Sequence, residues 1–166
     1  MRIMTYPEPF LRRKVQPVKE ITQELLANIG PMFETMYAAK GVGLAATQVG
    51  IDQTIFVLNI SGEPSDELVF VNPELVSSEG EVFDVEGCLS LPGLEAKLRR
   101  AESVVVRALD VEGREFELEG TGYLARALQH EIDHLAGILF IDKIGPAARI
   151  GLRTRLQELE ERFVTR

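Results

Sequence analysis

Cysteine, histidine and tryptophan are scarce in this sequence, whose 166 positions include one cysteine, two histidines and no tryptophan. The single cysteine, Cys88, excludes an internal disulfide and is typical of a reducing compartment. No apolar run approaches the ~18 residues needed to cross a membrane, and the N-terminal residues do not resemble a transit peptide. The formal charge of -8 disfavours binding to DNA. We therefore expect a cytoplasmic protein that binds neither DNA nor a membrane.

The pattern of apolar residues predicts helices at both ends of the chain and strands between them. In the first helix, Gly30-Pro31 predicts a kink or two shorter helices, because proline removes a backbone hydrogen bond. A glycine-rich loop follows at 41–50, and Asp110–Gly113 has the composition of a hairpin turn. The expected helices lie at 19–40, about 121–136 and 146–164, and the expected strands at 53–60, 68–76, 81–83, 102–111 and 114–120.

Strands that are grouped between helices favour an α+β fold. We expect one domain over residues 1–166, with mainly antiparallel sheets packed around a buried central helix that carries HEIDH (130–134), and with a C-terminal helix. In that central helix, Leu124, Leu128, Ile132 and Leu135 gather opposite the histidines, which predicts burial of the apolar face against the sheet.

The stretch QHEIDHLAG (129–137) contains both histidines of the chain in the pattern H-E-x-x-H. On a helix, His130 and His134 lie roughly 40° apart on one face with Glu131 beside them, so two imidazoles can hold one metal ion. The alternative is a pair of core histidines that bind no ligand. A catalytic site of this type needs a third protein ligand.

Three candidates for that ligand differ in their surroundings. One large class of metalloproteases has a third histidine where this chain has Phe140, so that class is excluded. A glutamate ligand would come from a charged, solvated terminal helix, where Glu158, Glu160 and Glu161 lie. The remaining candidate is Cys88, whose thiolate would complete a shell that leaves a position open for water. An inert buried thiol is the alternative for Cys88.

GVGLAATQ (41–48), EGCLS (86–90) and QHEIDHLAG (129–137) together resemble the peptide deformylase family over nearly the whole chain. The resemblance implies that Cys88, His130 and His134 bind one divalent metal ion, Fe2+ in the cell, although Zn2+, Ni2+ or Co2+ also suit this shell. It implies removal of the N-formyl group from the formyl-methionine of nascent polypeptides, with release of formate, in a bacterial cytoplasm.

The same resemblance implies roles for other residues. Glu131 would act as general base and acid, while Gln48 and the backbone N–H of Leu89 would stabilise the oxyanion. The substrate would lie extended against the backbone, with Val42, Gly43 and Gly87 as binding residues. Two departures concern the methionine pocket, where Tyr123 and Arg126 replace expected apolar residues; Arg126 would bend outward and leave its stem on the pocket.

Several alternatives remain at this point. Gly41, Gly43 and Ala46 fit a dinucleotide-binding loop, but this loop follows a helix and leads to a strand, the reverse of what that motif requires. A metallopeptidase of another type and a non-catalytic metal-stabilised binding protein also fit parts of the pattern. The arginines and glutamates of the C-terminal helix favour a solvated face, and the resemblance offers a transient ribosome contact instead. Glu86 is expected to pair with an arginine, for which Arg100 is the candidate.

Overall fold

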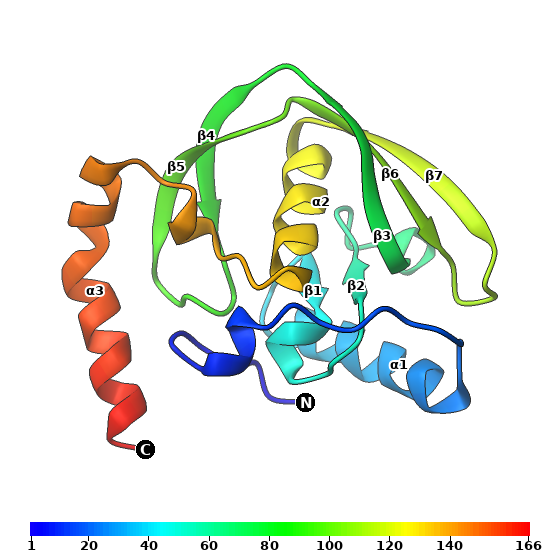
Figure 1. Cartoon of the computed structure of the whole chain (residues 1–166), viewed down its shortest axis with the longest axis horizontal. Coiled ribbons are helices and arrows are strands. Elements are labelled where there is room, and N and C mark those ends of the chain that lie inside the picture. The colour runs from blue at the N-terminus through cyan, green and yellow to red at the C-terminus, as the bar shows by residue number, and fades with distance from the viewer.

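The computed structural model describes all 166 residues as an α+β fold in which antiparallel strands surround one central helix (Figure 1). The longer elements are α1 (Gln23–Ala38), β1 (Gly43–Ala45), β2 (Ile55–Leu58), β3 (Leu68–Glu79), β4 (Val82–Gly87), β5 (Glu95–Arg100), β6 (Ser103–Leu109), β7 (Glu115–Thr121), α2 (Gly122–Leu135) and α3 (Pro146–Val164). Short 3-10 turns lie at η1 (Pro9–Arg12), η2 (Ala46–Val49), η3 (Pro64–Asp66) and η4 (Phe140–Asp142). The expected fold class is confirmed.

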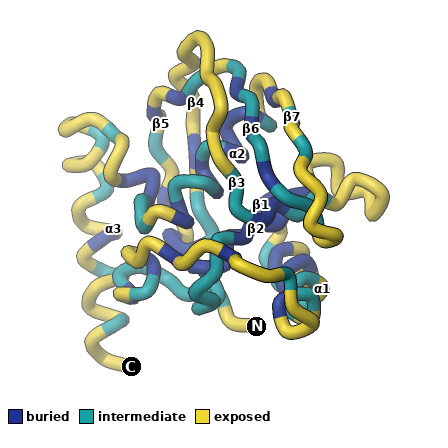
Figure 2. Tube along the Cα trace, turned by 45° about the vertical axis from the view of Figure 1, so that its right-hand side comes forward, coloured by how far each residue is buried: buried dark blue, intermediate teal, exposed yellow.

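Five strands form one antiparallel sheet in the order β1-β2-β3-β6-β7, and β4 pairs with β5 in a separate two-stranded sheet. Along β6, Val104, Val106 and Ala108 alternate with more exposed residues, as expected for a strand with one covered face. That face packs on α2 through Ala125 and Leu128. The predicted burial of the helix that carries HEIDH is confirmed, and Figure 2 shows buried residues concentrated along α2 and the neighbouring strands.

Strand β2 is buried along its whole length because helices cover both of its faces. Phe56 packs in the cluster that includes α2, while Val57 packs with Met32 and Met36 of α1. This arrangement explains why β2 lacks the alternation of polar and apolar residues that a half-exposed strand shows.

Helix α1 is one continuous helix with Pro31 inside it, so the alternative of two shorter helices is wrong. It begins at Gln23 and is capped by Thr22, whose Oγ1 accepts a hydrogen bond from the N–H of Leu25. Proline costs the helix one backbone hydrogen bond, and burial of an apolar face offsets that cost. That face consists of Leu25, Met32, Phe33 and Met36.

Strand β5 was not expected, because four of the six residues in EAKLRR are charged. Its inward positions are Leu98 and Arg100, and the buried Arg100 is neutralised by partners from other elements. Strand β4 is longer than the expected 81–83, and β1 lies within the expected glycine-rich loop. The predicted turn is confirmed, since the N–H of Gly113 donates to the carbonyl of Asp110 between β6 and β7.

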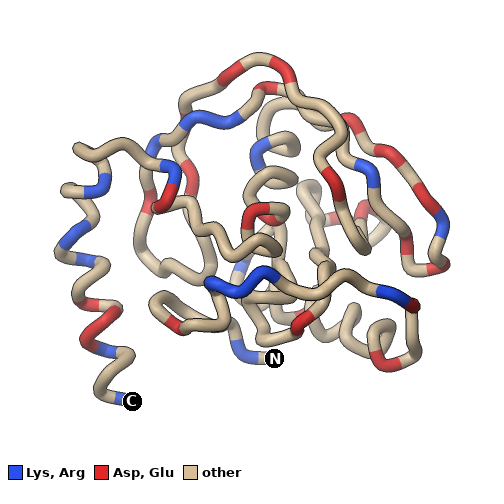
Figure 3. The backbone as a smooth tube through the Cα atoms, viewed as in Figure 1, with Lys and Arg blue, Asp and Glu red and all other residues tan.

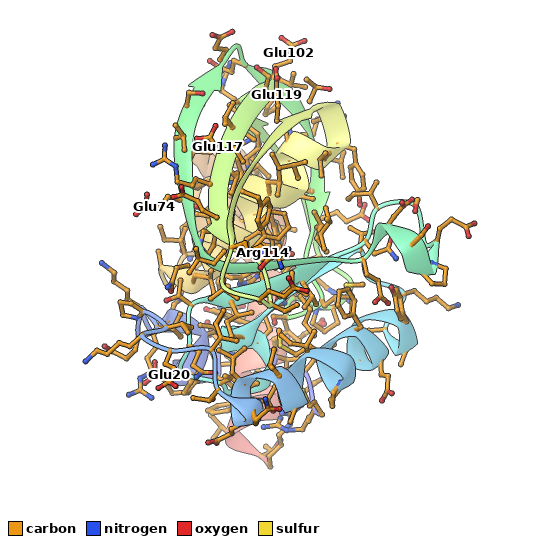
Figure 4. The ribbon with its side chains drawn as sticks, turned by 90° about the vertical axis from the view of Figure 1, so that its right-hand side faces the viewer. Glu20, Glu74, Glu102, Arg114, Glu117 and Glu119 are labelled. Atoms are coloured by element: carbon orange, nitrogen blue, oxygen red, sulfur yellow. The ribbon has the colours of Figure 1, made fainter.

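Charges on the outer face of the five-stranded sheet are mostly negative. Figure 3 shows acidic residues recurring along β7, and Figure 4 shows Glu74, Glu102, Glu117 and Glu119 on the sheet side of the molecule. Arg107 neutralises part of this negative charge through ion pairs with Glu115 and Glu117. None of the helices is both long and apolar enough to cross a bilayer.

Helix α3 has the expected bounds, and it packs beside the two-stranded sheet rather than on the central helix (Figure 1). Its apolar side is only partly covered: Leu156 is buried, while Leu152 and Leu159 are partly buried against the same cluster. The rest of α3 is mostly exposed, which agrees with its charged composition.

Candidate metal centre and active site

Cys88 meets the two histidines of α2 at the end of β4. The Nε2 atoms of His130 and His134 are 3.0 Å apart, and Cys88 Sγ lies 3.3 Å from His134 Nε2. One ligand atom from each residue lies within 4.8 Å of the others. Donors around one tetrahedral ion are about 3.3 to 3.8 Å apart, given bond lengths of about 2.0 to 2.3 Å. The three side chains therefore fit a metal site.

His130 is oriented by a buried carboxylate. Its Nδ1 lies 3.1 Å from Oε2 of Glu86, and Arg100 donates to both oxygens of that carboxylate at 3.1 and 2.7 Å. Burial alone would raise the pKa of Glu86, but the hydrogen bonds and charges of His130 and Arg100 outweigh burial and lower it to about 2. A carboxylate behind a ligating histidine is the usual means of holding its tautomer and orientation.

The two histidines have different surroundings. Burial alone would lower the pKa of His130, but its contacts with Cys88 and Glu86 raise it well above the ordinary value. Burial and the nearby charge of His130 lower the pKa of His134, whose Nδ1 has no partner in the protein. Surroundings that favour a positive charge at His130 also favour a bound cation.

Glu131 is buried and holds one unpartnered oxygen, Oε2. Burial raises its pKa to about 7, against the opposing charge of His130. The backbone of Gly43 approaches this side chain so closely that a Cβ there would lie 2.6 Å from Oε1 of Glu131. Glycine at position 43 therefore lets β1 and Glu131 face each other across the site.

Gln48 lies in η2 with both ends of its amide used. Its Oε1 accepts a hydrogen bond from the N–H of Ala45 at 2.9 Å, and its Nε2 donates to Ser90 Oγ at 3.1 Å. The same Nε2 lies 3.8 Å from Cys88 Sγ. The backbone N–H of Leu89, the residue after Cys88, donates to no acceptor within the protein. The Leu89 N–H is therefore free to bind a ligand.

A cleft of about 770 Å³ opens beside these groups. The expected binding residues Val42, Gly43 and Gly87 line it, as do all the other expected site residues except His134. His134 is buried and contacts Cys88 and His130. The carbonyl of Val42 already accepts from the N–H of Asn59, so its N–H is the group left for a ligand.

Arg126 lines the cleft but does not bend outward, so that expectation is wrong. Its guanidinium donates to the carbonyls of Val82 and Leu98 and lies 3.5 Å from Glu86. These acceptors hold a buried charge that water would otherwise solvate. Tyr123 also lines the cleft and is 60% exposed.

Two residues of the site escaped the sequence analysis, although both lie in the motifs already described. Ser90, in EGCLS, accepts from Gln48 and directs its N–H to Cys88 Sγ at 3.4 Å. Asp133, in HEIDH, binds Arg100 at 2.6 Å and Lys143 at 3.1 Å. The only feature of the sequence that could have identified Ser90 and Asp133 is that they lie within these two motifs. The expected pairing of Glu86 with Arg100 is confirmed.

Comparison with known proteins gives matches over nearly the whole chain. A family model described as polypeptide deformylase matches residues 1–149. A peptide deformylase of Thermodesulfovibrio yellowstonii is 50% identical over 151 residues, 90% of this chain and 92% of the relative. The crystal structure of a peptide deformylase from Legionella pneumophila has a TM-score of 0.91 at 44% identity and covers 99% of this chain and 98% of that one. A Plasmodium falciparum peptide deformylase has a TM-score of 0.95 at 36% identity, with the same coverage.

Proposed function

This chain belongs to the peptide deformylase family, and we propose that Cys88, His130 and His134 hold its metal ion while Glu131 transfers the proton. The enzyme hydrolyses the N-formyl group of nascent polypeptides and releases formate. The observation that carries the assignment of residues is the meeting of three ligand atoms within 4.8 Å beside the buried Glu131.

The shell of one thiolate and two imidazoles leaves a position for a water molecule and the substrate. A divalent metal ion held there by Cys88, His130 and His134 would supply polarisation of the formyl carbonyl and a lower pKa for bound water. Glu131 accepts the proton that water loses as it adds to the formyl carbon, and donates it to the departing amine. Its burial and its unpartnered Oε2 support this role, because no other group of the protein competes for that oxygen.

Negative charge develops on the formyl oxygen as the carbon becomes tetrahedral. Gln48 Nε2 and the N–H of Leu89 are the two donors that we assign to that oxygen. Gln48 is held by Ala45 and Ser90, so the donor is oriented before the substrate arrives. Such preorganised donors are each worth about 3 kcal/mol of transition-state stabilisation.

The peptide that follows the formyl group lies extended between Val42 and Gly87 in this proposal. Two features support it: Val42 N–H is unused within the protein, and Gly87 ends β4 at the cleft. An extended peptide satisfies its backbone groups by pairing with strand edges, so recognition does not depend on most of its side chains. Gly43 brings the backbone of the loop within reach of Glu131.

For the metal we propose Fe2+ in the cell, as the resemblance to the family implies. The ligand set itself accepts several divalent ions and does not select one. The test is metal analysis of protein purified without oxygen, together with formate release from a formyl-methionyl peptide. Iron at one equivalent with formate release is expected. Activity that survives complete metal removal would contradict the assignment. Family membership disfavours the two alternatives of another metallopeptidase and a non-catalytic protein.

A transient ribosome contact through α3 is a separate proposal, and it would place the enzyme in the cytoplasm beside its substrate. Exposed Arg153 supports it, because this arginine has no ion pair within the protein, whereas Arg155 contacts Glu158. Charge reversal at Arg153 should weaken cosedimentation with ribosomes without exposing the apolar face of α3. Unchanged cosedimentation would exclude Arg153 from the contact.

A further inference from the structure

Lys40 adopts a left-handed backbone conformation, with φ of 58°, directly after α1. Its N–H donates to the carbonyl of Tyr37, and the N–H of Gly41 donates to that of Met36. This pair of bonds ends many helices, and glycine is the usual residue at the left-handed position because a Cβ is disfavoured there. Here glycine follows one residue later. Lys40 therefore occupies a position where glycine would be easier to accommodate.

Lys40 lines the cleft, two residues before Val42. It is exposed and makes no ion pair or side-chain hydrogen bond within the protein. The other positive groups of the cleft differ, because Arg126 is buried against Glu86 and two carbonyls, and His130 contacts Glu86. Lys40 is the unpaired cation of the cleft.

Glu95 supplies the opposite charge from the other wall. It is the first residue of β5 and pairs with Gly87 of β4, and its Cγ lies 3.5 Å from where a Cβ of Gly87 would be. Its stem thus covers the strand end to which we assign the peptide. Glu95 also lines the cleft, is exposed and has no ion pair. The remaining acidic groups of the cleft, Glu86 and Glu131, are buried.

We propose that Lys40 and Glu95 determine which charged side chains are preferred just after the formyl-methionine of the substrate. Lys40 favours acidic residues on the Val42 side of the peptide, and Glu95 favours basic residues on the Gly87 side. The inference rests on the proposed placement of the peptide between Val42 and Gly87. An exposed charge pair changes affinity modestly and is weakened by salt, so the effect adjusts preference rather than excluding substrates.

The test compares C-terminally amidated formyl-methionyl peptides that carry one Asp or one Lys at the second, third or fourth residue, with alanine elsewhere. At low ionic strength, the ratio of kcat/KM for the Asp over the Lys peptide should fall about threefold in Lys40→Gln and about tenfold in Lys40→Glu at one position at least. Glu95→Gln should raise the ratio about threefold. Lys14→Gln is the matched control, because Lys14 is exposed, makes no ion pair and lies outside the cleft.

Ratios equal to those of the unmodified enzyme at all three positions, in the variants of Lys40 and of Glu95, would overturn the inference. A shift in only one set of variants would overturn the role of the other residue. Failure of the unmodified enzyme to release formate from the all-alanine peptide would instead contradict the proposed active site. The two failures are therefore distinguishable.

Lys40→Gly separates substrate preference from stability. Removal of the Cβ should raise Tm, because glycine adopts a positive φ without steric cost, while the Asp over Lys ratio should fall as it does in Lys40→Gln. Lys40→Gln keeps the Cβ and should leave Tm unchanged. A lower Tm in Lys40→Gly would show that the lysine side chain stabilises the fold, which would contradict the claim that glycine is easier to accommodate at position 40.

Discussion

His130 Nδ1 lies 3.1 Å from Glu86 Oε2, and the same carboxylate is bound by Arg100 through two hydrogen bonds. Glu86, in β4, therefore joins helix α2, which carries both histidines, to the two-stranded sheet from the inside. The side chains of Glu86 and Arg100 are only 5% and 3% exposed, so neither charge has water as an alternative partner. Glu86 therefore contributes both to the orientation of His130 and to the stability of the fold.

Glu86→Gln should lower the free energy of unfolding by about 3 kcal/mol, because it leaves the buried Arg100 without its main counter-charge. Urea denaturation of the two proteins measures the difference. Glu81→Gln is the control, since the ion pair of Glu81 with Arg99 is mostly exposed and should contribute less than about 1 kcal/mol. Equal effects of the two substitutions would contradict the role of Glu86 as a buried anchor.

Cys88→Ser should abolish activity or weaken metal binding strongly, because a serine hydroxyl does not replace a thiolate ligand. Metal content per protein after dialysis measures this directly. Cys88→Asp keeps an anionic ligand and should retain more metal than Cys88→Ser. A fully loaded and active Cys88→Ser protein would exclude Cys88 from the metal shell.

Glu131→Gln should reduce kcat by about two to four orders of magnitude while the metal content stays the same, since the amide cannot accept the proton. Formate release and metal analysis on the same preparation measure both quantities. Tm should not fall, because the change removes an ionisable group that is fully buried with one unpartnered oxygen. Glu117→Gln, on the exposed face of β7, is the control. Loss of metal from Glu131→Gln would argue that Glu131 is itself a ligand.

Asp142 should make stability depend on pH in the acid range. Burial alone would raise its pKa, but the hydrogen bonds from Arg12 and the N–H of Leu139, with the charge of Arg12, outweigh burial and lower it. A group whose pKa is lower in the folded state stabilises the protein above its unfolded pKa of about 3.9 and loses that contribution as pH falls through the folded value.

The unfolding free energy of Asp142→Asn should therefore lie about 1 kcal/mol below that of the unmodified protein at pH 7, after allowance for partial exposure, and the gap should close as pH falls below about 4. Urea denaturation at several pH values measures the gap. A gap that stays constant down to pH 2 would show that charge at Asp142 is not its source.

Much of the fold could be anticipated, since helical and strand periodicities are local properties of the chain. The exceptions depend on contacts between elements that are distant in the sequence. Strand β5 was missed because its buried Arg100 looks like a surface residue until Glu86 and Asp133 are placed around it. Helix α1 continues through Pro31 because the buried face of the helix offsets a cost that periodicity alone could not weigh.

The candidate active site was likewise predicted in part from the sequence. Every proposed metal ligand, donor and base lies in one of the sequence motifs, and the structure brings all of them except His134 to one cleft. His134 is buried and contacts Cys88 and His130. The orientation of Arg126 could not be inferred, because it depends on carbonyls of Val82 and Leu98 that lie on two other strands. The proposed roles of Lys40 and Glu95 likewise could not be inferred from the sequence, because they depend on both residues lining one cleft.

Spacing along a helix was sufficient to place His130, Glu131 and His134 together, because the turn of a helix fixes which side chains share a face. The approach of Cys88 to His134, the burial of Glu131 against Gly43, and the charges at the mouth of the cleft depended on how the β4–β5 sheet and the β1 loop pack around α2. Contacts between residues distant in sequence come from packing of whole elements, which residue identity constrains but does not specify.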